Sequence, residues 1–407
     1  MHTRRIAVIG GGIIGASVAA QLTTRNDANS VVLYEKESAP GTHQTGHNSG
    51  VVHAGLYYQP GSLKARLTRR GVELLHAYSE SRGIRYDECG KLVVAHTEKQ
   101  LGQLDAILEK ARANGVPGVA IIGEDAMHEI EPHCVGRAAI HSPHTAIVDY
   151  PGVTRALLED VRAAGGEVRL GTSVSRITQQ GSEQIVHTSG GSQAFDYVIA
   201  CNGLQSDRLA KRSGAGKYPA IVPFSGDYYK LRPESAKLVN GLLYPVPDPD
   251  YPFLGVHLTR TVDDEVTVGP NAFLSFAREQ YHRFGFNVRD AIQIASSGAF
   301  WRFAGGNFAE AIDQLRTANK RSFLAGAQEF IPELASEDLI PGLRGVRAQA
   351  MNEDSTLEDD FVIQRVNNAV FVRNAPSPAA TSAMAIAEHI IEEILAEDRL
   401  VEPLRGA

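Results

Sequence analysis

The chain has 407 residues, of which 43% are hydrophobic and 21% charged, a composition typical of a globular protein and not of a disordered one. Its formal net charge of −7 argues against nucleic acid as a main partner, because phosphate binding requires a concentrated basic surface. No apolar run reaches the length of a transmembrane helix, and the first strand begins too near Met1 for a cleavable signal peptide. We therefore expect a cytoplasmic protein, with peripheral contact to a membrane left open.

The cysteines indicate a reducing compartment. Cys89, Cys134 and Cys201 are scattered, and no two of them have C-x-x-C spacing. We expect small buried side chains at these positions, and neither a disulfide framework nor a metal site.

The first predicted elements, over residues 6–35, are a strand, a glycine-rich turn, a helix and a second strand. Gly10, Gly12 and Gly15 fill the pattern G-x-G-x-x-G directly after an apolar run, and Glu35 follows twenty residues later. The first glycine permits the turn, the second lets a pyrophosphate approach the backbone, and the third lets helix and strand pack closely. A carboxylate here accepts a hydrogen bond from a ribose 2′-hydroxyl and repels a 2′-phosphate. The pattern predicts FAD or NAD and excludes NADP.

The next stretch, residues 41–65, is rich in glycine, hydroxyl and imidazole side chains. It buries poorly and suits ligand contact. The density of its ring and amide side chains favours at least one chemical role. They are His43, His47, Asn48, Ser49, His53, Tyr57 and Tyr58.

Helices and strands alternate over residues 62–203. Caps at Ser62 and Thr97 predict helices that end near Gly83 and Asn114, and Pro151 opens another helix. Strands are expected at 91–95, 138–150, 167–177 and 195–203, the last two returning to the nucleotide-binding sheet. The turn near Val174 is a candidate for adenine contact.

Residues 218–268 read as short strands separated by proline and glycine, as in an antiparallel sheet, with Tyr244 and His257 on separate strands. Helices are expected at 289–303 and 308–331. Strands at 342–351, 361–366 and 369–374 then precede a terminal helix over 376–398. Its start, residues 377–382, has the small and hydroxyl side chains of a helix end beside a cofactor, and equally those of an ordinary cap.

Five segments in this order resemble a known family. They are HNSGVVHAGLYYQPGSLKA (47–65), DECGKLVVA (87–95), LLYPVPDPDYPFLGVHLTRTVDDEVTVGPNA (242–272), GLRGVRAQ (342–349) and VRNAPSPAATSAMAIA (372–387). The chain resembles the L-2-hydroxyglutarate oxidases and dehydrogenases of the FAD-dependent D-amino-acid oxidase superfamily. The resemblance implies an α/β fold with a Rossmann-like FAD-binding domain built from segments 1–80, 145–215 and 335–407. An α+β substrate domain with an antiparallel sheet would comprise 81–144 and 216–334.

The resemblance also implies a reaction: oxidation of L-2-hydroxyglutarate to 2-oxoglutarate, with hydride transfer from C2 to flavin N5 and electrons passed to a quinone or oxygen. Non-covalent FAD is expected. The cofactor-binding positions carried over are Gly10, Gly12, Gly15, Glu35, Asn48, Ser49, Val174, Ser377, Ala380 and Thr381. The substrate-side positions are His53, Tyr244, His257 and Arg347.

The chemistry needs a base for the C2 hydroxyl proton and cations for two carboxylates. His53 is our first choice of base and His257 the second, on the premise of a neutral imidazole near its ordinary pKa of about 6.5. Arg347 is the preferred carboxylate ligand. The lesser candidates are Tyr57, Tyr58, Lys64 and Arg302; the two cations among these are expected mainly to be surface or structural charges.

Two alternatives stay open. A related flavin oxidoreductase could act on another 2-hydroxy acid, on an amine such as sarcosine, or on glycerol 3-phosphate. A nucleotide-binding regulatory or scaffold protein would bind flavin without turnover.

Overall fold

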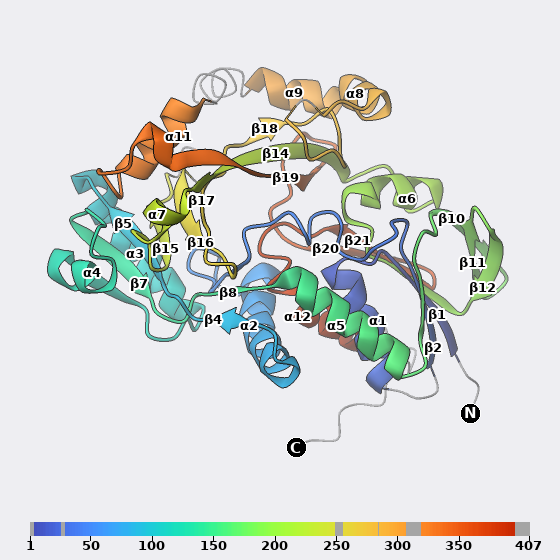
Figure 1. Cartoon of the computed structure of the whole chain (residues 1–407). Coiled ribbons are helices and arrows are strands. Elements are labelled where there is room, and N and C mark those ends of the chain that lie inside the picture. The colour runs from blue at the N-terminus through green and yellow to red at the C-terminus, as the bar shows by residue number, and fades with distance from the viewer. Residues whose placement is uncertain (1–3, 26–28, 249–254, 284, 307–318, 395–407) are drawn as a thin grey trace.

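The computed structural model describes residues 4–25, 29–248, 255–283, 285–306 and 319–394 (Figure 1). A largely parallel sheet and a largely antiparallel sheet lie side by side, each with its own helices. This is the mixed α/β fold class that the sequence predicts.

The parallel sheet is assembled from strands that are far apart in the sequence. Its order is β20-β21-β13-β1-β2-β9, with β20 antiparallel at the edge. The strands are β1 (Arg4–Ile9), β2 (Asn29–Tyr34), β9 (Glu167–Arg169), β13 (Tyr197–Ala200), β20 (Val362–Val366) and β21 (Ala369–Asn374). The central β1 is buried on both faces, with Ile6 and Val8 in one core and Ala7 and Ile9 in another. A continuous apolar run is what a parallel strand covered on both faces requires.

Different layers cover the two faces of this sheet. One face carries α1 (Ile13–Arg25), α5 (Tyr150–Ala163) and α12 (Ala383–His389), and α2 (Leu63–Arg82) packs on α12. The other carries a small antiparallel sheet and a helix: β10 (Val174–Gln180), β11 (Glu183–Thr188), β12 (Gly191–Phe195) and α6 (Ser206–Arg212). Because α1 follows β1 directly, its N-terminus lies at the carboxyl edge of the sheet, where α/β proteins bind ligands.

The antiparallel sheet has the order β18-β14-β17-β16-β15-β5-β7-β6, and β19 pairs with β14 along nearly its whole length. The strands are β5 (Lys91–Ala95), β6 (Ala120–Gly123), β7 (Ala138–Ser142), β14 (Ala220–Leu231), β15 (Leu242–Pro245), β16 (His257–Arg260), β17 (Val266–Gly269), β18 (Phe273–Leu274) and β19 (Leu339–Met351). Only the β15–β5 pair within this order is parallel, and it places Leu242 beside Lys91. These statements cover the described part of the chain.

Smaller elements complete the fold. The helices are α3 (Glu98–Ala113), α4 (Glu124–Ile130), α7 (Pro233–Ala236), α8 (Val288–Ala295), α9 (Gly298–Gly306) and α11 (Lys320–Gln328). Three short strands, β3 (Val51–Val52), β4 (Tyr86–Asp87) and β8 (Ala146–Val148), pair in the order β3-β8-β4. Figure 1 shows α8 and α9 on the outer side of β14 and β18, away from the parallel sheet.

The predicted caps are present where the sequence placed them. Ser62 accepts a hydrogen bond from the Ala65 amide at the start of α2, and Gly83 ends that helix in the left-handed conformation. Thr97 and Gln100 form a capping box at the start of α3.

Three predicted elements differ from the structure. The expected helix over 289–303 is two helices, because the Ser297 hydroxyl accepts the Phe300 amide and starts α9 anew. Of the expected strand 167–177 only β9 joins the parallel sheet, because β10 pairs with β11 instead. The terminal helix begins at Ala383, after a turn over 376–382, and continues as a π-helix over Ile390–Ile394.

The ends of two predicted helices lie outside the described residues: 308–318 of one and 395–398 of the other. The division into two domains stays a prediction. The two sheets support it, although β19 lies within the segment 335–407 assigned to the FAD domain and pairs with the antiparallel sheet.

Candidate active site

The glycine turn between β1 and α1 is a cradle that side chains would fill. Gly10 has φ 109°, and a Cβ there would lie 2.4 Å from the Cys201 carbonyl oxygen. A Cβ on Gly15 would lie 1.9 Å from the Gly10 oxygen, so this glycine sets the close packing of α1 on β1. At Gly12 a Cβ would meet only the Thr45 hydroxyl, at 3.3 Å. The face of Gly12 is therefore open to the cavity.

Glu35 lies at the end of β2 with both carboxylate oxygens engaged. One accepts the Gly11 amide at 2.6 Å and the other the Glu37 amide at 2.8 Å. Each oxygen keeps a second lone pair, and the side chain lines the cavity. A Cβ on Gly11 would lie 2.9 Å from the Glu35 Cβ, so the middle glycine of the run makes room for this carboxylate.

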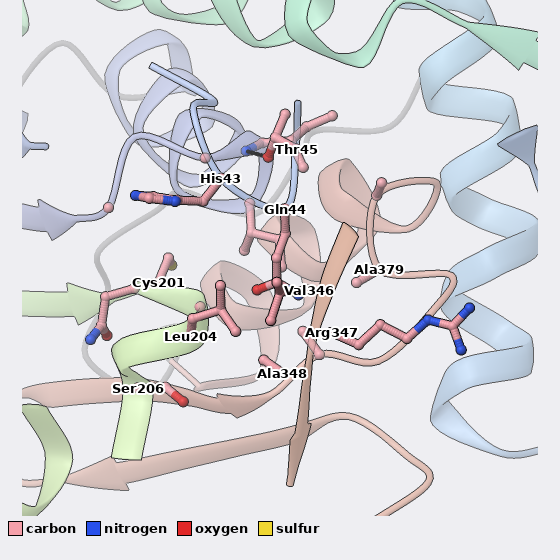
Figure 2. Close-up of a pocket in the computed structure, with 18 of the residues that line it drawn as sticks. His43, Gln44, Thr45, Cys201, Leu204, Ser206, Val346, Arg347, Ala348 and Ala379 are labelled. Atoms are coloured by element: carbon pink, nitrogen blue, oxygen red, sulfur yellow. Dashed lines mark hydrogen bonds between the residues drawn. The ribbon is translucent and has the colours of Figure 1, made fainter. Parts of the chain in front are cut away.

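A single cavity of about 730 Å³ extends from this turn into the space between the two sheets. It is lined by every predicted site residue except Gly15, namely Gly10, Gly12, Glu35, Asn48, Ser49, His53, Val174, Tyr244, His257, Arg347, Ser377, Ala380 and Thr381. Its volume is within the range of small-molecule and cofactor sites. Figure 2 shows its lining from the loop at His43–Thr45 to Arg347.

Thr381 ties the C-terminal turn to the histidine loop. Its hydroxyl accepts the His53 amide at 3.1 Å and shares a 3.0 Å hydrogen bond with the Tyr150 hydroxyl. Tyr150 also donates to the Val51 carbonyl at 3.0 Å. These buried bonds fix the backbone of His53 between two segments more than 300 residues apart.

Asn48 acts on its own loop. Its amide nitrogen donates to the Thr45 carbonyl at 2.6 Å, and its oxygen accepts the Gly50 amide at 2.7 Å. Thr45 in turn accepts the Ile13 amide at the start of α1, at 3.1 Å. The loop is therefore held against the helix terminus that faces the cavity.

His257 and Tyr244 form a stacked pair in the wall of the cavity, with ring centroids 4.0 Å apart. The Gly255 carbonyl lies 2.9 Å from His257 Nδ1. Since a carbonyl only accepts, Nδ1 carries the proton and Nε2 of the neutral ring is the acceptor. Burial lowers the pKa of His257 to about 3, and the charges of Lys91 and Arg347 act in the same direction.

His53 opens onto the same cavity, and within the described residues its imidazole makes no hydrogen bond. Burial lowers its pKa to about 3, and the charge of Lys91 lowers it further. The premise that either histidine keeps a pKa near 6.5 is therefore wrong for the protein without substrate. Both imidazoles are neutral at physiological pH because they are poorly solvated.

The candidate carboxylate ligands differ in their surroundings. Arg347, on β19, lines the cavity, and Figure 2 shows its side chain extending away from Cys201 and Leu204. Lys64, expected to be a surface or structural charge, is buried in the cavity wall, and its ammonium is 2.8 Å from Asp359. Arg302 is exposed and bonds Ser355, outside the cavity.

An ionic cluster joins the two halves of the molecule beside Glu35. The Lys36 ammonium contacts Glu37, lies 2.8 Å from His43 Nε2 and 3.1 Å from Glu279. Among the described residues, these three partners are the one group with spacing suitable for a metal ion. The ammonium already provides their positive charge.

Comparisons with known proteins agree with this geometry. The sequence model of the family described as "FAD dependent oxidoreductase" (DAO) matches residues 5–393. The chain is 41% identical to the mitochondrial L-2-hydroxyglutarate dehydrogenase of Homo sapiens, over 96% of this chain and 88% of that protein. It is also 41% identical to the L-2-hydroxyglutarate dehydrogenase of Escherichia coli K12, over 95% and 92%. The chain belongs to this family of FAD-dependent oxidoreductases.

A solved structure extends the likeness to the fold. L-alpha-glycerophosphate oxidase from Mycoplasma pneumoniae, with FAD bound, superposes with a TM-score of 0.79 at 20% identity, covering 96% of this chain and 94% of that one. Within the described residues, no helix is long and apolar enough to cross a membrane.

The residues present fit the FAD of the family. The open face of Gly12 and the N-terminus of α1 suit a pyrophosphate, because no Cβ obstructs it and the helix dipole favours negative charge. The spare lone pairs of Glu35 suit ribose hydroxyls. FAD is thus the cofactor expected in the cavity.

The sequence left several lining residues unpredicted. Gly11 was hidden within a glycine run, although three successive glycines were a signal. Thr45 gave none, because the amide it accepts is 32 residues away. Tyr228, buried beside Arg347, lay in a predicted strand without any mark of function.

Proposed function

We propose that this chain oxidises L-2-hydroxyglutarate to 2-oxoglutarate with non-covalently bound FAD. The observation that carries the proposal is 41% identity to L-2-hydroxyglutarate dehydrogenases over nearly the whole chain. The cavity supports it by bringing together an arginine and two neutral imidazoles. FAD, when bound, supplies the acceptor for the C2 hydride.

In this proposal His53 takes the proton from the C2 hydroxyl and His257 hydrogen-bonds the substrate. The free ring of His53 and the defined acceptor nitrogen of His257 support these roles. A bound dicarboxylate raises the pKa of a neighbouring imidazole, because opposite charge favours the protonated form. Proton acceptance thereby becomes coupled to substrate binding. Arg347 binds one carboxylate through its planar fork.

The test is anaerobic mixing of the holoenzyme with L-2-hydroxyglutarate, its D enantiomer, sarcosine and glycerol 3-phosphate, while flavin absorbance is followed. Bleaching by L-2-hydroxyglutarate at the highest rate is the expected result. Faster bleaching by sarcosine or glycerol 3-phosphate would establish one of the alternative activities. Absence of bleaching with every compound would indicate a flavin-binding protein without turnover.

Reduced flavin must pass its electrons to a quinone or oxygen, and a surface patch supports a membrane quinone. Phe286, Val288, Ile292 and Trp301 are 58%, 64%, 61% and 59% exposed on and beside α8 and α9. Clustered exposed apolar side chains mark protein or membrane contacts. Reoxidation of the reduced enzyme by oxygen and by quinone in anionic vesicles will identify the acceptor. Ile292→Glu is expected to abolish vesicle binding and to leave flavin bleaching in solution unchanged.

A further inference from the structure

Lys91 is a buried cation with no anionic partner. It is the first residue of β5 and is 3% exposed. Within the described residues, its ammonium makes no hydrogen bond or ion pair and instead lies 3.6 Å from the ring centroid of Tyr244 and 5.1 Å from that of Tyr57. Lys64, similarly buried, has Asp359 at 2.8 Å.

The ionised form of Lys91 is costly to maintain. Removal of an ammonium from water is unfavourable unless a charge or hydrogen bonds compensate it. Burial lowers its pKa to about 7. The titratable groups that face it are Tyr57, Tyr244, His53 and His257, of which none is an anion at neutral pH. This cost indicates a functional reason for the lysine.

Lys91 lies one side chain behind the cavity wall. Tyr244 stands between it and His257, and both of these rings line the main cavity. On its other side Lys91 borders a small space of about 10 Å³ that it shares with His53 and Tyr57. The Tyr57 hydroxyl there is buried and without a partner in the described residues. The positive charge therefore acts on the cavity through a thin wall.

The cavity around these rings has an excess of positive charge. Arg347 and Lys91 both lower the pKa of His257, and the ammonium of Lys64 is already paired with Asp359. An anion that enters this region meets two cations. This charge balance suits a ligand with two negative groups.

We propose that Lys91 is a positioning residue that makes the site selective for dicarboxylates: acting through Tyr244, its ammonium favours the second carboxylate of the substrate while Arg347 binds the first. The inference rests on the proposed function. Two unit charges roughly 8 Å apart at an effective dielectric constant of about 20 attract each other enough for a roughly thirtyfold effect on affinity. Partial protonation reduces this to about tenfold.

The experiment compares L-2-hydroxyglutarate with L-2-hydroxypentanoate, which has the same carbon chain without the distal carboxylate. In Lys91→Met holoenzyme the ratio of the two kcat/KM values is expected to fall about tenfold, and in Lys91→Arg, which keeps the charge, to stay within about threefold of wild type. Lys64→Met, the matched buried lysine with a paired charge, is expected to leave the ratio unchanged. An equal loss for both substrates in Lys91→Met would show a merely structural role and overturn the proposal, as would a ratio that moves only in Lys64→Met.

A binding measurement separates this inference from the proposed reaction. Titration of the flavin spectrum with 2-oxoglutarate and 2-oxopentanoate gives dissociation constants without turnover. Preference for the dicarboxylate is expected in wild type and lost in Lys91→Met, even if the enzyme turns out to oxidise another substrate. Lys91→Gln is prepared in parallel, so that one neutral variant that retains FAD decides. Undiminished dicarboxylate preference in it refutes the role of Lys91.

Discussion

Replacement of Lys91 by methionine is expected to stabilise the protein while impairing its selectivity. The pKa of Lys91 falls from an ordinary value of 10.5 to about 7 in the folded chain. At about 1.36 kcal/mol for each pH unit, this difference corresponds to a cost of about 4 kcal/mol at pH 7. Local rearrangement and water entry reduce it, so the expected gain for Lys91→Met is about 1–4 kcal/mol in the free energy of unfolding.

The pH dependence gives this prediction its sign. Between pH 7 and 10.5 the unfolded chain binds a proton at Lys91 that the folded chain has lost, so wild-type stability rises with pH over this interval. The advantage of Lys91→Met is therefore largest at or below pH 7 and vanishes near pH 10.5. Urea unfolding of both proteins with equal excess FAD, at pH 6 to 10, measures the difference. A variant less stable than wild type at pH 7, or a gap independent of pH, would refute the reasoning.

Further predictions concern the cofactor and the histidines. Gly15→Ala places a methyl group 1.9 Å from the Gly10 oxygen and is expected to weaken FAD binding roughly tenfold or more, measured as flavin per protein after dialysis; full retention of flavin would contradict the close packing. Gln at position 53 or 257 is expected to slow single-turnover flavin reduction, the His53→Gln variant roughly 10²–10⁴-fold; if both variants reduce at the wild-type rate, neither histidine is the base. Because burial lowers the pKa of both to about 3, kcat/KM is expected to show no decline from their protonation between pH 7 and 5, where a decline centred near 6.5 would show solvated rings. Acid precipitation is expected to release yellow flavin into the supernatant, and a yellow pellet would indicate covalent attachment.

Local patterns in the sequence were sufficient for the nucleotide end of the molecule. The glycine turn, the carboxylate of Glu35 and the caps at Ser62 and Thr97 depend on residues within about twenty positions of one another, so spacing alone predicts them. The family resemblance, which the comparisons confirm, added positions such as His257 and Arg347. Their arrangement around one cavity agrees with the resemblance, and their chemical roles stay predictions.

Lys91 shows what the sequence could not reveal. In KLVVA a lysine at the start of an apolar strand reads as a solvated end. Its burial comes from β15, about 150 residues later, which lays Leu242 beside it and Tyr244 over its ammonium. The pKa of His53 was mistaken for the same reason, because solvation depends on long-range packing. The break between α8 and α9 depends on one serine hydroxyl that competes for the backbone.

The order of strands in the parallel sheet has a consequence for how the protein is made. β1, which carries the glycine turn, emerges first from the ribosome, yet its neighbour β13 and the next strand β21 are synthesised about 190 and 365 residues later. Thr381, which holds the His53 backbone, comes later still. A nascent chain can therefore form the β1–α1–β2 unit early but cannot enclose the cofactor until translation is nearly complete. Flavin capture should coincide with the last step of folding, and a chain truncated before β21 should remain colourless.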